Sequence, residues 1–196
     1  MECAVRASCA CRIFNVCGAA YIRLMYILAP ERDLYPMSAF ANYAEYLEQN
    51  RARFPPSAYA LATSDWYFDS FIHHAPHDAW LESIVIEEPS SGSRREIRET
   101  AITIKLLGAY HDGFIELRYP RVFGFQLTTI EITKGHGDWR YDEFRVDEEG
   151  RLIHEIQWSA REATATWLIV ASDVHHRWAP FSEEELKSLF KQTEDV

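Results

Sequence analysis

Cysteine is missing from most of this chain. All four cysteines lie within the first 17 of its 196 residues, at Cys3, Cys9, Cys11 and Cys17. A disulfide-stapled secreted domain would spread its cysteines through the fold, so this distribution is unlike that class. The four also lack the C-x2-C pairs and nearby histidines of a zinc site. No cysteine nucleophile is available beyond residue 17.

Glycine is scarce too, with eight residues. Neither G-x-x-x-x-G-K nor G-x-G-x-x-G occurs, so no glycine-rich phosphate loop is expected. A G-x-S-x-G elbow is also lacking, which removes one scheme of serine catalysis. The apolar stretch 13–22 is broken by Arg23, which makes it too short for a transmembrane helix, and no clear signal-peptidase site follows it.

Positive charge is in short supply. The chain holds 20 Lys and Arg against 30 Asp and Glu, a formal net charge of -10. A surface of this sign repels phosphate, and no basic cluster offsets it, so we expect neither nucleic acid nor a membrane as partner. A basic protein is the electrostatically favoured partner. The alternative is that the charge only keeps the domain soluble.

What the chain does contain is typical of one folded domain. The hydrophobic fraction is 47% and the aromatic fraction 14%. Bulky rings suit the half-buried faces of sheets, where they pack against cross-strand neighbours. A chain of this length buries a substantial core as a single unit.

The N-terminal part shows no regular periodicity before Met37, where a helical pattern starts. We therefore predict that residues 1–36 form a poorly ordered extension and that residues 37–196 form a single α+β domain. One explanation for the extension is an over-extended translation start, with Met37 as the true beginning of the protein.

Two terminal helices are predicted. Ser38 is the expected N-cap of a helix that ends near Asn50, because apolar residues recur there at i, i+3, i+4 and i+7. Near the C-terminus, Ser182 and Glu185 have the spacing of a capping box. A further short helix near residues 58–62 is left open, since the aromatic cluster that follows it has no clear period.

The region between the helices reads as antiparallel β-structure. Its best-defined feature is a hairpin in which Asp147–Gly150 forms the turn. A phase change in the apolar pattern also predicts a β-bulge near Thr128 and Thr129. Six to seven strands arranged as a curved sheet or open barrel are expected. The predicted strands are Trp80–Glu88, Ile97–Leu107, Phe114–Tyr119, Val122–Thr133, Trp139–Val146, Arg151–Trp158 and Thr164–Ser172.

Histidines next to carboxylates are the most suggestive chemical feature, because an acid fixes the imidazole tautomer and raises its basicity. Several such groups at one end of a sheet would suit a divalent metal or a general base. Against this, many of them sit in turns, where Asp and Gly occur for backbone reasons. We predict no metal site and no cofactor. The candidate binding residues are His77, Asp78, His111, Asp112, His136, Asp138, Trp139 and Asp142.

Two neighbouring residues raise a separate question. Asp142 and Glu143 alternate on a predicted strand, so one of them faces inward. We expect an inward carboxylate to pair with Arg140, Arg145 or Arg161, with a functional role as the alternative. His154 and Glu155 are also adjacent on a predicted strand, so their side chains point to opposite faces and cannot belong to the same site unless the strand is distorted.

The stretch 77–86 (HDAWLESIVI), together with Gly113–Tyr119, Val122 and the closing hairpin, resembles a group of small bacterial β-rich domains. The resemblance covers about residues 77–174. Some members of that group are similar to immunity proteins of bacterial toxin systems, and many have no known function. The resemblance implies a non-enzymatic cytoplasmic domain whose acidic surface masks a partner such as a basic toxin active site. It transfers no catalytic residues to this chain.

The leading functional interpretation is a binding or interaction domain without catalysis. The alternative is a metal-dependent hydrolase that uses His and Asp residues near the strand ends. Small-ligand binding by the aromatic residues is a further possibility, for which core packing is the competing explanation.

Overall fold

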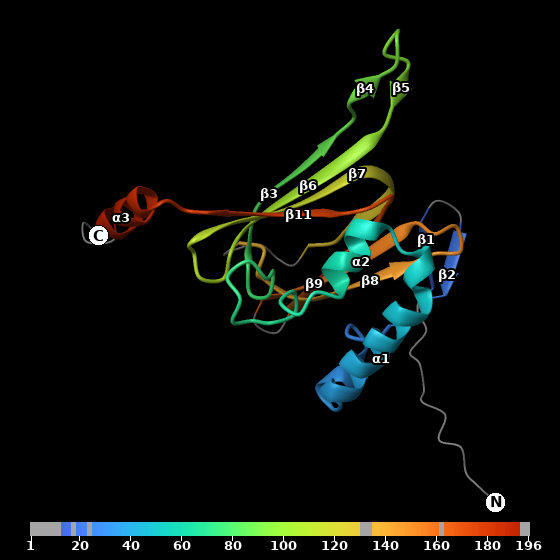
Figure 1. The fold of residues 1–196 in the computed structure, drawn as a ribbon, viewed down its shortest axis with the longest axis horizontal. Helices are drawn as coiled ribbons and strands as arrows, with labels where there is room; N and C mark the ends of the chain where they lie inside the picture. Colours follow the sequence, from blue (N-terminus) through green and yellow to red (C-terminus); the bar gives the residue numbers. More distant parts are fainter. Residues whose placement is uncertain (1–12, 17–18, 23–24, 130–134, 161–162, 193–196) are drawn as a thin grey trace, which may run out of the picture.

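A computed structural model of the chain describes residues 13–16, 19–22, 25–129, 135–160 and 163–192. Seven antiparallel strands make the main sheet, in the order β10-β9-β8-β3-β6-β7-β11, and β7 also pairs with β10. Six of them therefore close into a ring, to which β11 is added (Figure 1). The α+β prediction is confirmed. The strands are β3 (Trp80–Glu87), β6 (Thr100–Leu107), β7 (Gly113–Leu127), β8 (Asp138–Val146), β9 (Leu152–Ala160), β10 (Ala163–Ala171) and β11 (His175–Pro180).

The predicted hairpin is formed by β8 and β9. Gly150 has a φ of 77°, a left-handed conformation that costs glycine little and most other residues strain. The Asp147 carboxylate closes the turn by accepting the backbone N–H of Arg151 at 2.8 Å. The turn residues and the alternation of the strands both indicate a hairpin here, which is why the sequence alone was sufficient to predict it.

β7 differs from its prediction. It runs unbroken through Pro120, where two strands were expected. On one edge, residues 113–118 pair with β11 and residues 122–127 pair with β10. Pro120 lies between the two partners, so its missing N–H breaks neither ladder. The described register shifts of β7 lie at residues 119–122 against β6 and at residues 122–124 against β10. Residues 130–133 of the predicted strand, which follow the expected bulge at Thr128 and Thr129, lie outside the described ranges.

The remaining elements lie around the ring. Helix α1 begins at Pro36, with Tyr35 and not Ser38 at the N-cap, whereas the capping box of Ser182 and Glu185 opens α3 as predicted. No helix in the described part of the chain is long and apolar enough to cross a membrane. These elements are β1 (Ile13–Val16), β2 (Ala19–Ile22), η1 (Pro30–Asp33), α1 (Pro36–Asn50), η2 (Arg51–Arg53), α2 (Pro56–Ala62), β4 (Ser90–Ser91), β5 (Ile97–Arg98) and α3 (Glu183–Gln192).

Two parts project from the ring in Figure 1. The hairpin of β4 and β5 prolongs β3 and β6 beyond the ring, and α3 follows β11 away from it. Helices α1 and α2 lie on the side of β8. Inside the ring, three tryptophans pack in series, with ring centroids 5.4 Å apart for Trp139 and Trp158 and 4.9 Å apart for Trp158 and Trp167.

The predicted domain boundary at residue 36 follows a segment that packs against β8. Ile27 is fully buried and Arg32 is 8% exposed. The Glu143 carboxylate accepts the backbone N–H groups of Tyr26 at 3.0 Å and Leu28 at 3.3 Å. The folded unit therefore includes the chain from residue 26 onward. Apolar periodicity did not reveal this, because the only regular element between residue 26 and α1 is the four-residue 3-10 helix η1 (Pro30–Asp33).

Candidate functional site

A carboxylate lies at the centre of a buried polar network inside the ring. Asp142 is 2% exposed. Its Oδ2 atom lies 2.9 Å from the Tyr67 hydroxyl and 2.9 Å from Nε2 of His154. Its Oδ1 atom accepts the indole N–H of Trp139 at 2.9 Å. The Tyr119 hydroxyl completes the chain, 2.6 Å from Nδ1 of His154.

The network fixes the histidine tautomer. A carboxylate accepts hydrogen bonds, so Nε2 of His154 carries the proton and Nδ1 accepts the Tyr119 hydroxyl. Burial is the main reason that the pKa of His154 is lowered, and it outweighs the opposing hydrogen bond to Asp142. Burial likewise raises the pKa values of Tyr67 and Tyr119 well above their usual value. At neutral pH both tyrosines are protonated donors and His154 is neutral.

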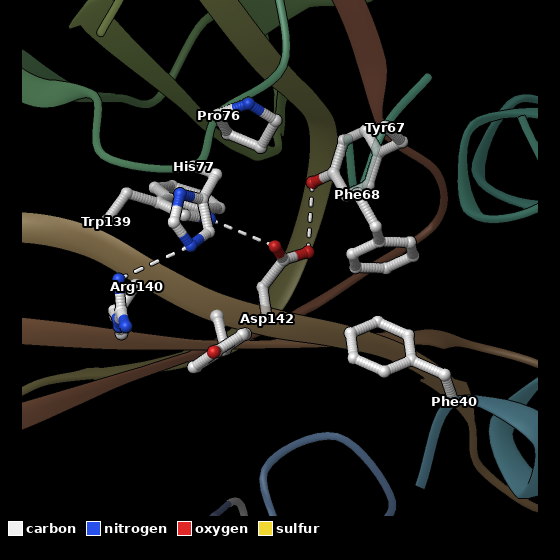
Figure 2. Close-up of a pocket in the computed structure, with 9 residues that line it drawn as sticks. Phe40, Tyr67, Phe68, Pro76, His77, Trp139, Arg140 and Asp142 are labelled. Carbon is white, nitrogen blue, oxygen red and sulfur yellow. Dashed lines mark hydrogen bonds between the residues drawn. The ribbon is translucent and has the colours of Figure 1, made fainter. Parts of the chain in front are cut away.

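A small pocket reaches Asp142 from outside the network. Figure 2 shows Tyr67 and Trp139 pointing at the two carboxylate oxygens, while His77 faces Arg140. The cavity volume is about 20 Å³, which holds a water molecule but no organic substrate. Its lining residues are Phe40, Tyr67, Phe68, Pro76, His77, Trp139, Arg140, Tyr141 and Asp142.

Asp142 and Glu143 do point to opposite faces of β8, and both are buried. The inward residue, Asp142, contacts Tyr, Trp and His side chains and neither Arg140 nor Arg145. Arg161, the third arginine expected for it, lies outside the described residues. Glu143 faces the N-terminal segment, with Oε1 3.4 Å from Nε of Arg145. Arg145 also contacts Glu155. The expected arginine pairing therefore exists, but on the outer side of the strand.

The other prominent feature is an exposed group of rings at one end of the ring of strands, here called the rim patch. His73 stacks on Tyr110 with centroids 4.1 Å apart and planes at 12°. Trp80 meets His111 edge to face at 4.4 Å. The Tyr110 hydroxyl bonds the carbonyl of Ser70, next to Phe71. The rim patch comprises Phe71, His73, Trp80, Tyr110 and His111, with Phe71 81%, Trp80 50% and Tyr110 46% exposed.

Two predicted carboxylates, Asp112 and Asp138, lie beside the rim patch, and a third, Asp78, lies two residues before Trp80 in the chain. Asp112 lies 2.5 Å from Nδ1 of His73. Asp138 is exposed and pairs in register with Trp80. Asp78 adopts a φ of 61° and contacts both His77 and Arg140, at 3.1 and 3.4 Å. Trp80 thus brings His111 and Asp138 together, whereas His77 contacts Asp78, Arg140 and Tyr141.

The other three predicted site residues, Trp139, Asp142 and His136, are not part of the rim patch. Trp139 and Asp142 belong to the buried network. His136 packs between Trp158 and Trp167, with centroids 4.8 and 4.9 Å away, and burial lowers its pKa. His136 therefore joins neither group.

The candidate list missed three members of the buried network. It also missed four members of the rim patch, namely Phe71, His73, Trp80 and Tyr110. His154 was recognised only as a neighbour of Glu155, and the structure confirms that the two face opposite sides of β9. Tyr67 and Tyr119 come from a loop and from β7, far from Asp142 in the sequence. Strand parity indicated that one of Asp142 and Glu143 points inward, but no local pattern indicates which tyrosines meet it.

The described residues contain no set of metal ligands: no three His, Cys, Asp or Glu side chains among them form a group that could hold an ion. Comparison of the chain with protein-family models, curated proteins and solved structures finds no match.

Proposed function

We propose that this protein is a non-catalytic protein-binding domain that presents the rim patch to a basic partner. The observation that carries the proposal is the exposed cluster of Trp80, Tyr110 and Phe71 among carboxylates. Tryptophan and tyrosine are enriched among the residues that contribute most to protein interfaces. Exposed rings held by stacking and hydrogen bonds lose little conformational freedom on binding.

The arrangement of the buried network also favours a structural role for its acid and histidine. Both ring nitrogens of His154 are occupied, by Asp142 and Tyr119. A general base needs access to a substrate proton within hydrogen-bond reach, and the side chain of His154 is fully buried. The cavity beside Asp142 holds little more than a water molecule.

Charge supports the choice of a basic partner. The chain has a net charge of -10, Asp112 and Asp138 lie beside the rim patch, and the neighbouring Asp78 contacts Arg140. Opposite charges across an interface speed association and discriminate against wrong partners. We further propose an immunity-like role in a bacterial cytoplasm, in which the domain masks a basic active site of its partner. The resemblance over residues 77–174 motivates this finer proposal.

The experiment uses the products of the genes adjacent to this one, each purified and titrated against the full chain by calorimetry. We expect one basic protein to bind, with an affinity that falls as salt rises from 0.05 to 0.5 M. Trp80→Ala and Tyr110→Ala should each weaken binding at least tenfold. The matched control is Tyr35→Ala, since Tyr35 is 65% exposed but lies at the start of α1.

Two outcomes contradict the proposal. One is the absence of any complex among the tested proteins. The other is a complex that Trp80→Ala and Tyr110→Ala leave as tight as the control does. Elemental analysis of the same protein tests the alternative, because one stoichiometric divalent metal lost on replacing His77 would favour a metal-dependent enzyme.

A further inference from the structure

Strand β3 has an open edge. One side of it pairs with β6 from Trp80 to Glu87, with a register shift between Leu81 and Ser83 that leaves Glu82 without a partner in the ladder. On the other side, its single pairing within the described residues joins Trp80 to Asp138 of β8. From Leu81 to Glu87 that side shows no backbone hydrogen bond among the described residues. An edge of this kind is a template for another strand.

The facing edge of β8 is treated differently. Tyr43 of α1 receives the backbone N–H of Phe144 at 2.7 Å and donates to the carbonyl of the same residue at 3.0 Å. Tyr46 accepts the backbone N–H of Val146 at 3.0 Å. Side-chain hydroxyls of α1 therefore occupy the positions that β3 would fill if the two strands stayed paired. β3 has no corresponding cover in the described part of the chain.

The side chains of β3 also leave its edge accessible. Val85 is 49% exposed and Ile86 is 45% exposed. Edge strands usually carry lysine or proline that discourages pairing. The sequence of β3, WLESIVIE, contains neither. Figure 1 shows β3 leading into the projecting hairpin of β4 and β5, so the edge is not recessed.

Charge argues against a second copy as the occupant. An antiparallel pair of β3 strands centred on Val85 would place Glu82 opposite Glu88. A pair shifted by one residue would place Glu82 opposite Glu87. Like charges directly opposite one another destabilise a strand pair, and no basic residue of β3 offsets them. A strand with lysine or arginine around an apolar centre is complementary instead.

We propose that the open edge of β3 receives an extended, basic segment of the partner protein, which adds a strand beside Leu81–Glu87. This inference rests on the proposed protein-binding function and specifies its mode. Trp80 belongs both to the rim patch and to β3, so the two surfaces are continuous. Backbone hydrogen bonds supply affinity in strand addition, and alternate side chains supply specificity.

The test uses a synthetic probe, the peptide acetyl-KVKVKVK-amide, with the full-length protein. Its control is the same peptide with alternate amides N-methylated, which keeps charge and composition but removes the donors along one edge. Binding is measured by calorimetry, and hydrogen exchange locates it. We expect the unmethylated peptide to bind at least tenfold more tightly and to protect the amides of Leu81–Glu87.

Charge variants locate the surface independently. E82K/E88K should abolish peptide binding, whereas E148K/E184K, with the same change in net charge at exposed sites elsewhere, should preserve it. Equal binding of the two peptides, protection outside β3, or no binding at all would overturn the proposal. Tyr110→Ala separates the two proposals, because it lies outside β3. It should weaken the partner complex and leave peptide binding unchanged. The role of the rim patch and the role of the β3 edge can therefore be disproved separately.

Discussion

Nε2 of His154 lies 2.9 Å from Oδ2 of Asp142, and both side chains are buried inside the ring of strands. By residue type alone, a histidine beside an aspartate resembles a catalytic acid–base pair. Tyr67, Trp139 and Tyr119 complete its hydrogen bonds, which makes it a satisfied polar core. Its expected consequences concern stability more than reactivity.

Replacing Asp142 by Ala should strongly destabilise the fold. Three buried donors, on Tyr67, Trp139 and His154, lose their acceptor at once. We expect the free energy of unfolding to fall by about 3–5 kcal/mol, measured by urea denaturation. Asp138→Ala is the control, since that side chain is exposed and its loss should cost less than about 0.5 kcal/mol. Equal effects would show that the network contributes nothing special.

Stability should fall as the pH drops below about 6.5. Burial lowers the pKa of His154 in the folded protein, while the unfolded chain binds its proton near pH 6.5. The unfolded state therefore holds more protons on acidification, and each such histidine contributes a slope of up to about 1.4 kcal/mol per pH unit. His136 and His176 shift in the same direction.

Thermal melts between pH 5 and 7.5 check this pH dependence. His154→Gln should reduce the dependence of the melting temperature on pH even though it lowers the melting temperature itself. His111→Gln, at an exposed position, is the control substitution. An unaltered slope in His154→Gln would contradict the assigned role of that histidine.

Ile27→Ala should be costly if the segment before α1 belongs to the fold. Ile27 is fully buried, so truncation leaves a cavity and should cost about 2–5 kcal/mol in chemical denaturation. Leu34→Ala removes a similar side chain that is 74% exposed, and it should be close to neutral. Similar small effects for both would restore the boundary at residue 36.

Gly137→Ala should destabilise more than Gly135→Ala. Both glycines have a positive φ, at 92° and 88°, so both substitutions introduce backbone strain of about 1 kcal/mol. A Cβ at Gly137 would lie 2.6 Å from the carbonyl oxygen of Ser159, whereas one at Gly135 meets no atom of the described residues within 4 Å. The difference in melting temperature between the two variants measures the close approach of the backbones alone.

Much of the fold was predictable because its signals are local. The turn at Asp147–Gly150, the alternation in β8 and β9 and the capping box at Ser182 each depend on residues close in sequence. The continuity of β7 through Pro120 was not predictable, because it depends on a change of partner strand from β11 to β10. The predicted start of the fifteen-residue helix α1 is three residues late, because Tyr35 and not Ser38 is the N-cap and Pro36 is the first helical residue.

The candidate site divides in the same way. The sequence predicted His77, His111 and their acidic neighbours as candidate binding residues. In the structure, Trp80 contacts His111 and pairs in register with Asp138. The partners of Asp142 were beyond reach, because Tyr67, Tyr119 and His154 come from three separate segments.

By itself, the sequence determined the class of the fold, the acidic charge and the strand alternation, because these follow from composition and from neighbours along the chain. Only the tertiary structure decided which carboxylate is sealed in the core, which rings stay exposed and which strand edge is left open. Ring closure is responsible: β7 pairs with β10, while Tyr43 and Tyr46 cover the edge of β8 and part it from β3. Such pairings join residues far apart in the chain, and no local propensity encodes them.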